Sequence, residues 1–348
     1  MVGKTGMRVT RAYSEVTAIV PASVANLGPG FDVHSIALQK PMIEVALASA
    51  PKGSHTIHLT GPYAEDVTTN PALHAGARAL ETLHKQFGKP DGYALRIRVE
   101  IPPRKGLGLS GAEAVGAVLC ANRLFKLGLD MQSVTRLAAT AEPSHHMDNV
   151  AASALGGFNI ITRTPLAEHP EITTLRPPAD LGVAVVVPDI EKASTEATRQ
   201  VLPATVAREQ YVRSMSYVAR ISAAFASSDV NAIIETLPWD PTVEPARADA
   251  ECYGKGIDSH FLQEEKEMLL REFHVAETIS GAGPSRALWY SISEDRRVRK
   301  KKQSGLVQVA IDQVSNRLRS LGHDVRKVYL TKPSTKGAAI KSTTKVRT

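Results

Sequence analysis

The segment that most constrains the fold is a glycine-rich loop that leads directly into an apolar helix. It reads Gly106-Leu107-Gly108-Leu109-Ser110-Gly111-Ala112, and Val115, Leu119 and Phe125 then follow at helical spacing before Gly128. Backbone N–H groups at a helix N-terminus are unpaired and partly positive, and glycine lets an anion approach closely. The loop therefore predicts a phosphate site, although its spacing is neither GxxxxGK[ST] nor GxGxxG.

Length and composition place the chain among ordinary globular proteins. Its 348 residues predict about two domains, and 43% hydrophobic with 22% charged residues excludes disordered, collagen-like and disulfide-scaffold classes. Cys120 and Cys252 lie far apart, so they predict neither a zinc knuckle nor a disulfide framework. The first twenty residues lack an apolar signal core, and no stretch approaches the ~18 apolar residues of a membrane span. We expect a cytoplasmic protein with no membrane partner.

The net charge of +7 raises the question of nucleic-acid binding. Six basic residues lie in the run RRVRKKK at 296–302, so one local segment carries almost the whole excess. A face that tracks phosphates would need basic residues spread along a groove and interleaved with aromatic rings. We therefore expect a solvated loop at 296–302 and no nucleic-acid partner.

The pattern along the chain changes near residue 175. Strand-like runs at 16–20, 43–47, 55–59 and 95–101 precede helices at 112–125 and 133–141 and a strand at 158–161. A proline-rich stretch at 166–180 lacks periodicity. Beyond it, strands at 181–188, 287–292 and 325–330 alternate with helices at 206–225, 264–272 and 306–321. The sequence thus predicts an α+β protein with domains at 1–175 and 176–348.

Four segments together resemble motifs of one superfamily, that of the GHMP kinases (galacto-, homoserine, mevalonate and phosphomevalonate kinases). They are PASVANLGPGFD at 21–32, the loop with its preceding prolines at 102–112, HMDNVA with LGGF at 146–158, and SGAGPS at 280–285. The third is more particular to the homoserine kinase branch. The resemblance implies an N-terminal domain like ribosomal protein S5 domain 2, a ferredoxin-like C-terminal domain and an active site in the cleft between them. It also implies ATP, Mg²⁺ and a homodimer.

Two further segments resemble the substrate-binding motifs of homoserine kinases, STEATR at 194–199 and EPAR at 244–247. Homoserine is a zwitterion, so its site needs a fork-shaped cation for the carboxylate and acidic or amide groups for the ammonium. Arg199 and Arg247 are expected to hold the carboxylate. The rest of the implied substrate site comprises Asn26, Asp32, His146, Asn149, Thr195 and Gly283.

The resemblance assigns the nucleotide and the metal to other residues. Pro102, Asn70 and the loop Gly106–Ala112 are expected to bind ATP, and Ser110 and Glu142 to hold Mg²⁺. PASVAN has no basic residue beside the acceptor, unlike the first motif of mevalonate-type relatives. We therefore expect Asn26, Asn149 and the metal to orient the acceptor hydroxyl, whose proton passes to a γ-phosphate oxygen or to water.

The chain departs from the family pattern close to these residues. Leu109 replaces the first serine of GLGSSAA, Glu113 stands among the usual alanines, and ADAECYG follows EPAR. Glu113 either faces away from the nucleotide or helps to hold the metal. Two alternatives stay open: a kinase for another small hydroxylated metabolite, such as a polyol or hydroxy acid, and a catalytically silent regulatory protein. The adjacent His145 and His146 lack the spacing of a zinc helix, so zinc is not expected.

Overall fold

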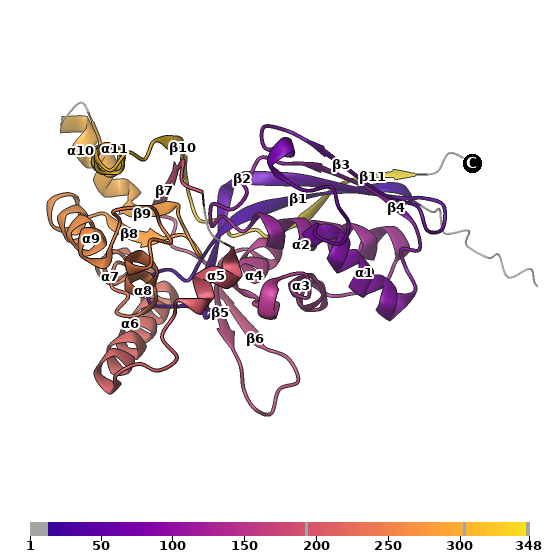
Figure 1. Cartoon of the computed structure of the whole chain (residues 1–348), viewed down its shortest axis with the longest axis horizontal. Coiled ribbons are helices and arrows are strands. Elements are labelled where there is room, and N and C mark those ends of the chain that lie inside the picture. The colour runs from indigo at the N-terminus through magenta and orange to yellow at the C-terminus, as the bar shows by residue number, and fades with distance from the viewer. Residues whose placement is uncertain (1–12, 192–193, 302–303, 346–348) are drawn as a thin grey trace, which may run out of the picture.

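Two β-sheets lie at opposite ends of the long axis of the molecule, each with its own helices (Figure 1). The computed structural model describes residues 13–191, 194–301 and 304–345. None of the helices among these residues is long and apolar enough to cross a membrane.

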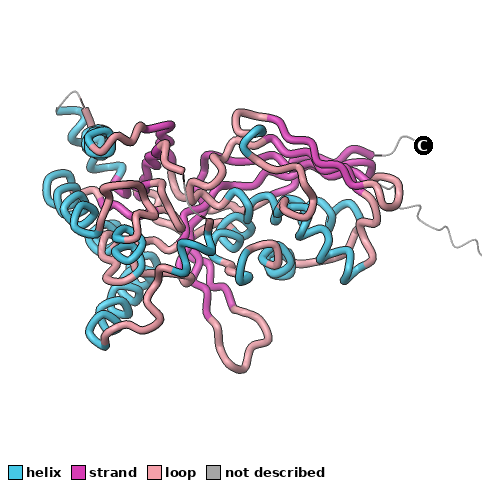
Figure 2. Tube along the Cα trace, in the orientation of Figure 1, coloured by secondary structure: helices cyan, strands magenta, loops and turns pink. Residues whose placement is uncertain are grey.

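The first sheet has seven strands, and the order along its main path is β11-β1-β2-β4-β3, with β5 on the start of β2 and β6 beside β5. Its strands are β1 (Tyr13–Ala25), β2 (His34–Ser49), β3 (His55–Thr60), β4 (Tyr93–Arg98), β5 (Phe158–Thr162), β6 (Glu171–Leu175) and β11 (Ala339–Lys345). Val16, Ala18 and Val20 alternate along β1 and are fully buried. Four helices cover one face of the sheet (Figures 1 and 2): α1 (Ala75–Phe87), α2 (Leu109–Phe125), α3 (Met131–Ala139) and α4 (Asp148–Leu155).

The second sheet has four antiparallel strands in the order β10-β7-β9-β8. They are β7 (Leu181–Pro188), β8 (Ala276–Ile279), β9 (Arg286–Ser291) and β10 (Val325–Thr331). Its helices are α5 (Thr195–Gln200), α6 (Arg208–Ser227), α7 (Val230–Thr236), α8 (Val243–Asp249), α9 (Ser259–Phe273), α10 (Ile292–Lys301) and α11 (Leu306–Ser320). Two short 3₁₀ turns, Ala64–Asp66 and Pro143–His145, lie in the first half. The mixture of sheets and helices confirms the α+β class.

Three features differ from the expectations. The stretch at 166–180 contains β6, which pairs with β5 from Phe158↔Leu175 to Thr162↔Glu171. The last strand, β11, pairs antiparallel with β1, so residues 339–345 complete the first sheet although they were expected in the second domain. Residues 296–301 of the basic run form the end of helix α10, where a loop was expected, and Lys302 lies outside the described residues. The exact division at residue 175 stays a prediction.

The two halves share a packed interface. The rings of Phe158 in β5 and Phe225 in α6 stack with centroids 3.9 Å apart and planes 5° apart. Both side chains are buried, and one hydrophobic cluster joins the core of the first sheet to Trp289 of the second. Such a shared core holds the residues on the two sides of the cleft in a fixed relation.

Candidate active site

A cavity of about 510 Å³ opens between the two halves, and both contribute to its walls. From the first half come the connection between β1 and β2 and segments within residues 66–75, 102–113 and 142–149. From the second half come Ser194, Arg199, Arg247, Gly281 and Ala282. Most of the residues predicted for nucleotide and for substrate therefore line one cleft.

Three sequence motifs are tied together at the base of this cavity. Ser280 Oγ donates to the carbonyl of Gly106 at 2.8 Å, and the amide of Gly281 donates to Ala25 O at 3.1 Å. The amide of Ser23 donates to Leu107 O at 3.2 Å. Because each bond joins segments far apart in sequence, the glycine-rich loop is fixed from both sides.

The glycine-rich loop presents free backbone amides to the cavity. Helix α2 begins at Leu109, and its first hydrogen bond runs from Ala112 N to Gly108 O at 2.9 Å. The amides of residues 108–111 precede that bond and have no acceptor within the helix. Ser110 is exposed on the cavity wall, where its hydroxyl is accessible to a ligand. The amide of Ala112, predicted to bind phosphate, is instead used by the helix itself.

Glycine is required at Gly108 for two reasons. Its φ is +71°, a left-handed conformation that L side chains rarely adopt. A Cβ there would also lie 2.1 Å from Ser23 Oγ and 2.9 Å from Asn149 Oδ1. The loop thus lies directly on the side chains of the first and third motifs.

The predicted substrate arginines lie close to the same aromatic ring. The guanidinium carbon of Arg199 lies 5.1 Å from the centroid of Phe31, and that of Arg247 lies 5.3 Å from it. Arg199 also makes two hydrogen bonds to Asp32, at 2.9 and 2.6 Å. These bonds and the charge of Asp32 outweigh desolvation and raise the pKa of Arg199. Asp32 was expected to bind the substrate ammonium, and here it pairs with the expected carboxylate-binding arginine.

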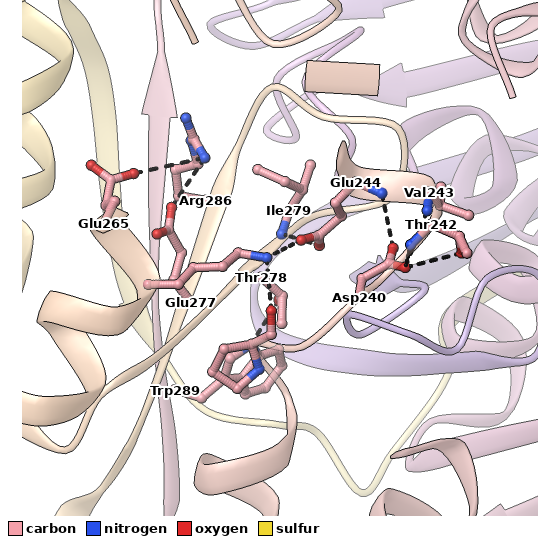
Figure 3. Close-up of polar contacts among 12 residues, drawn as sticks. Asp240, Thr242, Val243, Glu244, Glu265, Glu277, Thr278, Ile279, Arg286 and Trp289 are labelled. Atoms are coloured by element: carbon pink, nitrogen blue, oxygen red, sulfur yellow. Dashed lines mark hydrogen bonds and ion pairs between the residues drawn. The ribbon is translucent and has the colours of Figure 1, made fainter. Parts of the chain in front are cut away.

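Arg247 is held by backbone carbonyls and is only 2% exposed. Its Nε donates to Thr198 O at 3.0 Å and its Nη1 to Gly281 O at 3.3 Å. Helix α8, which carries Arg247, is anchored on its other side, as Figure 3 shows for Asp240, Glu244 and Ile279. Asp240 accepts from the amide of Glu244 at 2.9 Å, and Glu244 Oε1 accepts from the amide of Ile279, also at 2.9 Å.

The two predicted asparagines differ in how many of their side-chain polar atoms already have a hydrogen-bond partner in the protein. Asn26 Nδ2 donates to Gly281 O at 2.8 Å, and its Oδ1 accepts from the amide of Asp32 at 3.3 Å, so both ends help to shape the site. Asn149 Oδ1 accepts from Ser23 Oγ at 2.8 Å. With that end engaged, the Nδ2 group of Asn149 is the one that can donate to a ligand.

His146 links two carboxylates on one wall of the cavity. Its Nδ1 lies 2.9 Å from Asp148 Oδ1, and its Nε2 lies 3.4 Å from Glu142 Oε2. Burial lowers the pKa of His146, but the hydrogen bond and charge of Asp148 and the charge of Glu142 outweigh this and leave the pKa raised. His146 was expected to bind substrate, which stays a prediction; in this geometry it lies between Asp148 and Glu142.

A second acid and histidine lie on the same wall. Glu113 is 3% exposed, and its Oε1 lies 3.7 Å from Nε2 of the equally buried His74. Burial, together with the charge of Glu142, raises the pKa of Glu113 to about 8, and burial lowers the pKa of His74 to about 4. Because α2 begins at Leu109, Glu113 lies beyond the amides that face a phosphate.

The donor set here fits a hard divalent cation. Glu142 Oε1 and Glu113 Oε1 are buried without a hydrogen-bond partner, and Ser110 offers a hydroxyl on the same cavity. Carboxylate and hydroxyl oxygens are ligands that Mg²⁺ accepts, with phosphates and water completing its shell. In the part of the chain that is described, no three His, Cys, Asp or Glu side chains form a complete metal site by themselves.

Some predicted residues do not reach the cavity wall. Asn70 lies in the exposed loop before α1, where its Oδ1 accepts from the amide of Ala72 at 3.0 Å. Gly283, like Gly111 and Ala112, is buried behind the wall, and Thr195 begins α5 beside the lining residue Ser194. The wall also includes residues that were not assigned a role from sequence: Phe31, His74 and Asp148. Phe31 lies in the motif PASVANLGPGFD and Asp148 in HMDNVA, and this position within a motif was the sequence signal that could have identified them.

Comparison with known proteins supports the same family. Residues 75–157 match the model for the GHMP kinases N terminal domain. The chain is 30% identical over 275 residues to the homoserine kinase of Methanococcus vannielii, which covers 78% of this chain and 86% of that protein. It is 31% identical over 288 residues to the homoserine kinase of Haloarcula marismortui, covering 81% and 89%.

Solved structures agree on the fold. The crystal structure of homoserine kinase from Cytophaga hutchinsonii covers 96% of this chain and 100% of its own, with a TM-score of 0.77 and 21% identity. Mevalonate diphosphate decarboxylase from Staphylococcus aureus also matches, with a TM-score of 0.66 and 16% identity over 94% and 98% of the two chains. The fold therefore does not distinguish kinase from decarboxylase, whereas the sequence relatives do. By its motifs, its cleft and these relatives, the chain belongs to the homoserine kinase family of the GHMP kinases.

Proposed function

We propose that this protein transfers the γ-phosphate of ATP to the side-chain hydroxyl of L-homoserine, giving O-phospho-L-homoserine for threonine biosynthesis. The observation that carries the proposal is the group of Arg199, Arg247, Asp32 and Phe31 at one part of the cavity that also contains the amide loop. Two guanidinium groups and one carboxylate match the carboxylate and ammonium of an amino acid. A polyol has neither a carboxylate nor an ammonium group, so it would form no ion pair with these groups.

ATP fits the opposite part of the same cavity. The amides of residues 108–111 face the phosphates, and Val67 and Leu73 offer an apolar surface to the base. Leu73 is 67% exposed although it lines the cavity, so a planar ring that covered it would remove apolar surface from water. Asn70 lies between Val67 and Leu73 in the sequence, and its predicted contact with ATP belongs to the proposed site.

Catalysis then depends on alignment and charge neutralisation. Phosphoryl transfer passes through a loose transition state, so positioning matters more than a strong base. Mg²⁺, held by Ser110 and Glu142, would neutralise charge on the phosphates. His146 keeps Glu142 in place, and the free Nδ2 of Asn149 orients the acceptor oxygen. The proton of the hydroxyl passes to a γ-phosphate oxygen or to water, since Asp32 is engaged by Arg199.

The test is an acceptor panel with purified protein, ATP and Mg²⁺. L-homoserine, a C4 amino alcohol without the carboxylate, a polyol and a hydroxy acid are compared by ADP release and by mass of the product. We expect phosphorylation of homoserine with a kcat/KM at least ~10²-fold above that of the other acceptors, because each of them lacks the carboxylate, the ammonium group or both. A preference for the polyol or hydroxy acid would overturn the acceptor, and no ADP release with any acceptor would indicate a silent regulatory protein.

Three further parts of the proposal concern the setting of the enzyme. Cys120 is buried as a thiol that donates to Val45 O at 3.3 Å, which agrees with a reducing cytoplasmic compartment. Tyr211, Val212 and Met215 on α6 are at least half exposed, which supports a homodimer that covers them. No nucleic-acid partner is proposed, because the basic run at 296–301 is confined to the end of one helix, α10 (Figure 1). Light scattering of the purified protein tests the dimer.

A further inference from the structure

Glu113 is a buried carboxylate directly after the seven residues, 106–112, that resemble the family motif GLGSSAA. It is 3% exposed, yet it lines the cavity between Ser110 and Glu142, and its Oε1 has no hydrogen-bond partner. Within the described residues no lysine or arginine forms an ion pair with it, and its near neighbour is the imidazole of His74 at 3.7 Å. A buried carboxyl group is costly to ionise without a cation beside it, so Glu113 keeps its proton in the empty site and can give it up when a cation binds.

The neighbouring groups indicate what kind of ligand this is. Glu142 lines the same cavity, is 5% exposed and also has an unpartnered Oε1. Two carboxylates in one poorly solvated site repel each other, and a shared cation removes the repulsion. His74 is 1% exposed, and both of its ring nitrogens lack a hydrogen-bond partner in the described structure. It is therefore free to turn one nitrogen toward Glu113 and hold that carboxylate, as outer-shell partners do in metal sites.

We propose that Glu113 is a second carboxylate ligand of the divalent cation, added in this chain to the site formed by Ser110 and Glu142. The inference rests on the proposed function in one respect only, namely that Glu142 faces the cation. Mg²⁺ is commonly held by one or two carboxylates together with substrate phosphates, so two glutamates and one hydroxyl leave room for both nucleotide and water. His74 acts as a positioning residue for Glu113.

Mn²⁺ is the probe, because its free form gives an electron paramagnetic resonance signal and it accepts the same oxygen ligands as Mg²⁺. Mn²⁺ is titrated without nucleotide into the wild type, Glu113→Gln, Glu142→Gln and Glu65→Gln. Glu65 is an exposed residue of the turn near the cavity and is the matched control for loss of one negative charge. Glu113→Ala is a second variant in case glutamine disturbs packing.

The expected result is that Glu113→Gln and Glu113→Ala each raise the Kd for Mn²⁺ by ~10-fold or more, the range typical of losing a group that serves a metal site. Glu142→Gln should do the same, and Glu65→Gln should leave the Kd unchanged. If only Glu142→Gln weakens binding, Glu113 is not a ligand and the proposed kinase function stands. If the wild type binds no Mn²⁺, or if neither glutamate matters, the two-carboxylate site is overturned. Homoserine phosphorylation is measured separately, so the two proposals fail independently.

Discussion

Asp32 and Arg199 form a bidentate ion pair across the cleft, with Arg199 Nη1 2.9 Å from Asp32 Oδ2 and Arg199 Nη2 2.6 Å from Asp32 Oδ1. They come from the β1–β2 connection and from α5, 167 residues apart. The arginine expected to bind the substrate carboxylate thus already holds a carboxylate of the protein. Under the proposed function, an amino acid that enters would share this pair, with its own carboxylate on the arginine and its ammonium on Asp32.

The first prediction concerns Asp32. Asp32→Asn removes the charge that faces the ammonium, and losing one partner of such a charge pair costs ~2–5 kcal/mol. We expect the KM for homoserine to rise at least tens-fold at saturating ATP, with the KM for ATP unchanged. The control is Asp66→Asn, which also changes an aspartate on the cavity wall but whose partner is the exposed Arg326 at 3.1 Å. An unaltered KM for homoserine in Asp32→Asn would remove this residue from the acceptor site.

The second prediction separates Arg199 from Arg247. Lysine cannot reproduce a two-pronged contact, so Arg199→Lys and Arg247→Lys should each raise the KM for homoserine tens-fold. Arg247 is 2% exposed and bonds to Thr198 O and Gly281 O, so its replacement should also lower the Tm by several degrees, at about 2–4 °C per kcal/mol. Arg199 is partly exposed, and its variant should keep a Tm close to that of the wild type.

The substrate provides the companion measurement for both arginines. A C4 amino alcohol without the carboxylate should be a poor acceptor for the wild type, and Arg199→Lys or Arg247→Lys should weaken it little further. If the amino alcohol works as well as homoserine, or if both variants keep the wild-type KM, the arginines bind something other than the carboxylate.

The features that the sequence could predict are those that depend on a short stretch of neighbouring residues. The loop at 106–112 combines glycine content with helical spacing over a short window, and its place at the N-terminus of α2 follows from that window alone. The pairing of Asp32 with Arg199 and of β11 with β1 depends on contacts between distant segments, for which one sequence holds no spacing signal. His146 shows the same limit, because its two nitrogens face Asp148 and Glu142 and this placement needs coordinates.

The third prediction compares two glycines with nearly the same backbone conformation. Gly108 has φ +71° and Gly128 has φ +72°, so alanine at either position carries a left-handed penalty of ~1–2 kcal/mol. Only at Gly108 would the new Cβ meet atoms, with Ser23 Oγ at 2.1 Å, whereas nothing lies within 4 Å at Gly128. Gly108→Ala should therefore lose more unfolding free energy in urea than Gly128→Ala.

ATP binding provides the second readout for the same pair. Gly108→Ala displaces the amides that face the phosphates, so its Kd for ATP should rise at least ~10-fold, consistent with loss of charge-assisted hydrogen bonds. Gly128→Ala should bind ATP like the wild type. Equal losses of stability and of ATP affinity in the two variants would show that the loop does not pack as described.

The last prediction concerns acid stability and a histidine outside the cleft. His34 is fully buried, lies 3.0 Å from Ser222 Oγ through Nε2, and has its ring 4.9 Å from that of Phe158. Burial lowers its pKa from 6.5 to about 4. Between these values the unfolded chain binds a proton that the folded chain does not, so stability falls as the pH drops below 6.5 and no penalty applies above it.

From pH 7 to pH 5 this histidine should cost the wild type about 2 kcal/mol of unfolding free energy. His34→Gln, which cannot be protonated, should reduce the pH dependence by that amount in urea titrations at the two pH values. His84→Gln changes an exposed histidine of α1 and should keep the pH dependence of the wild type. A pH dependence that is identical in His34→Gln and the wild type would mean that His34 accepts its proton in the folded state, and therefore that the contact between β5 and α6 at Phe158 is open to water at pH 5.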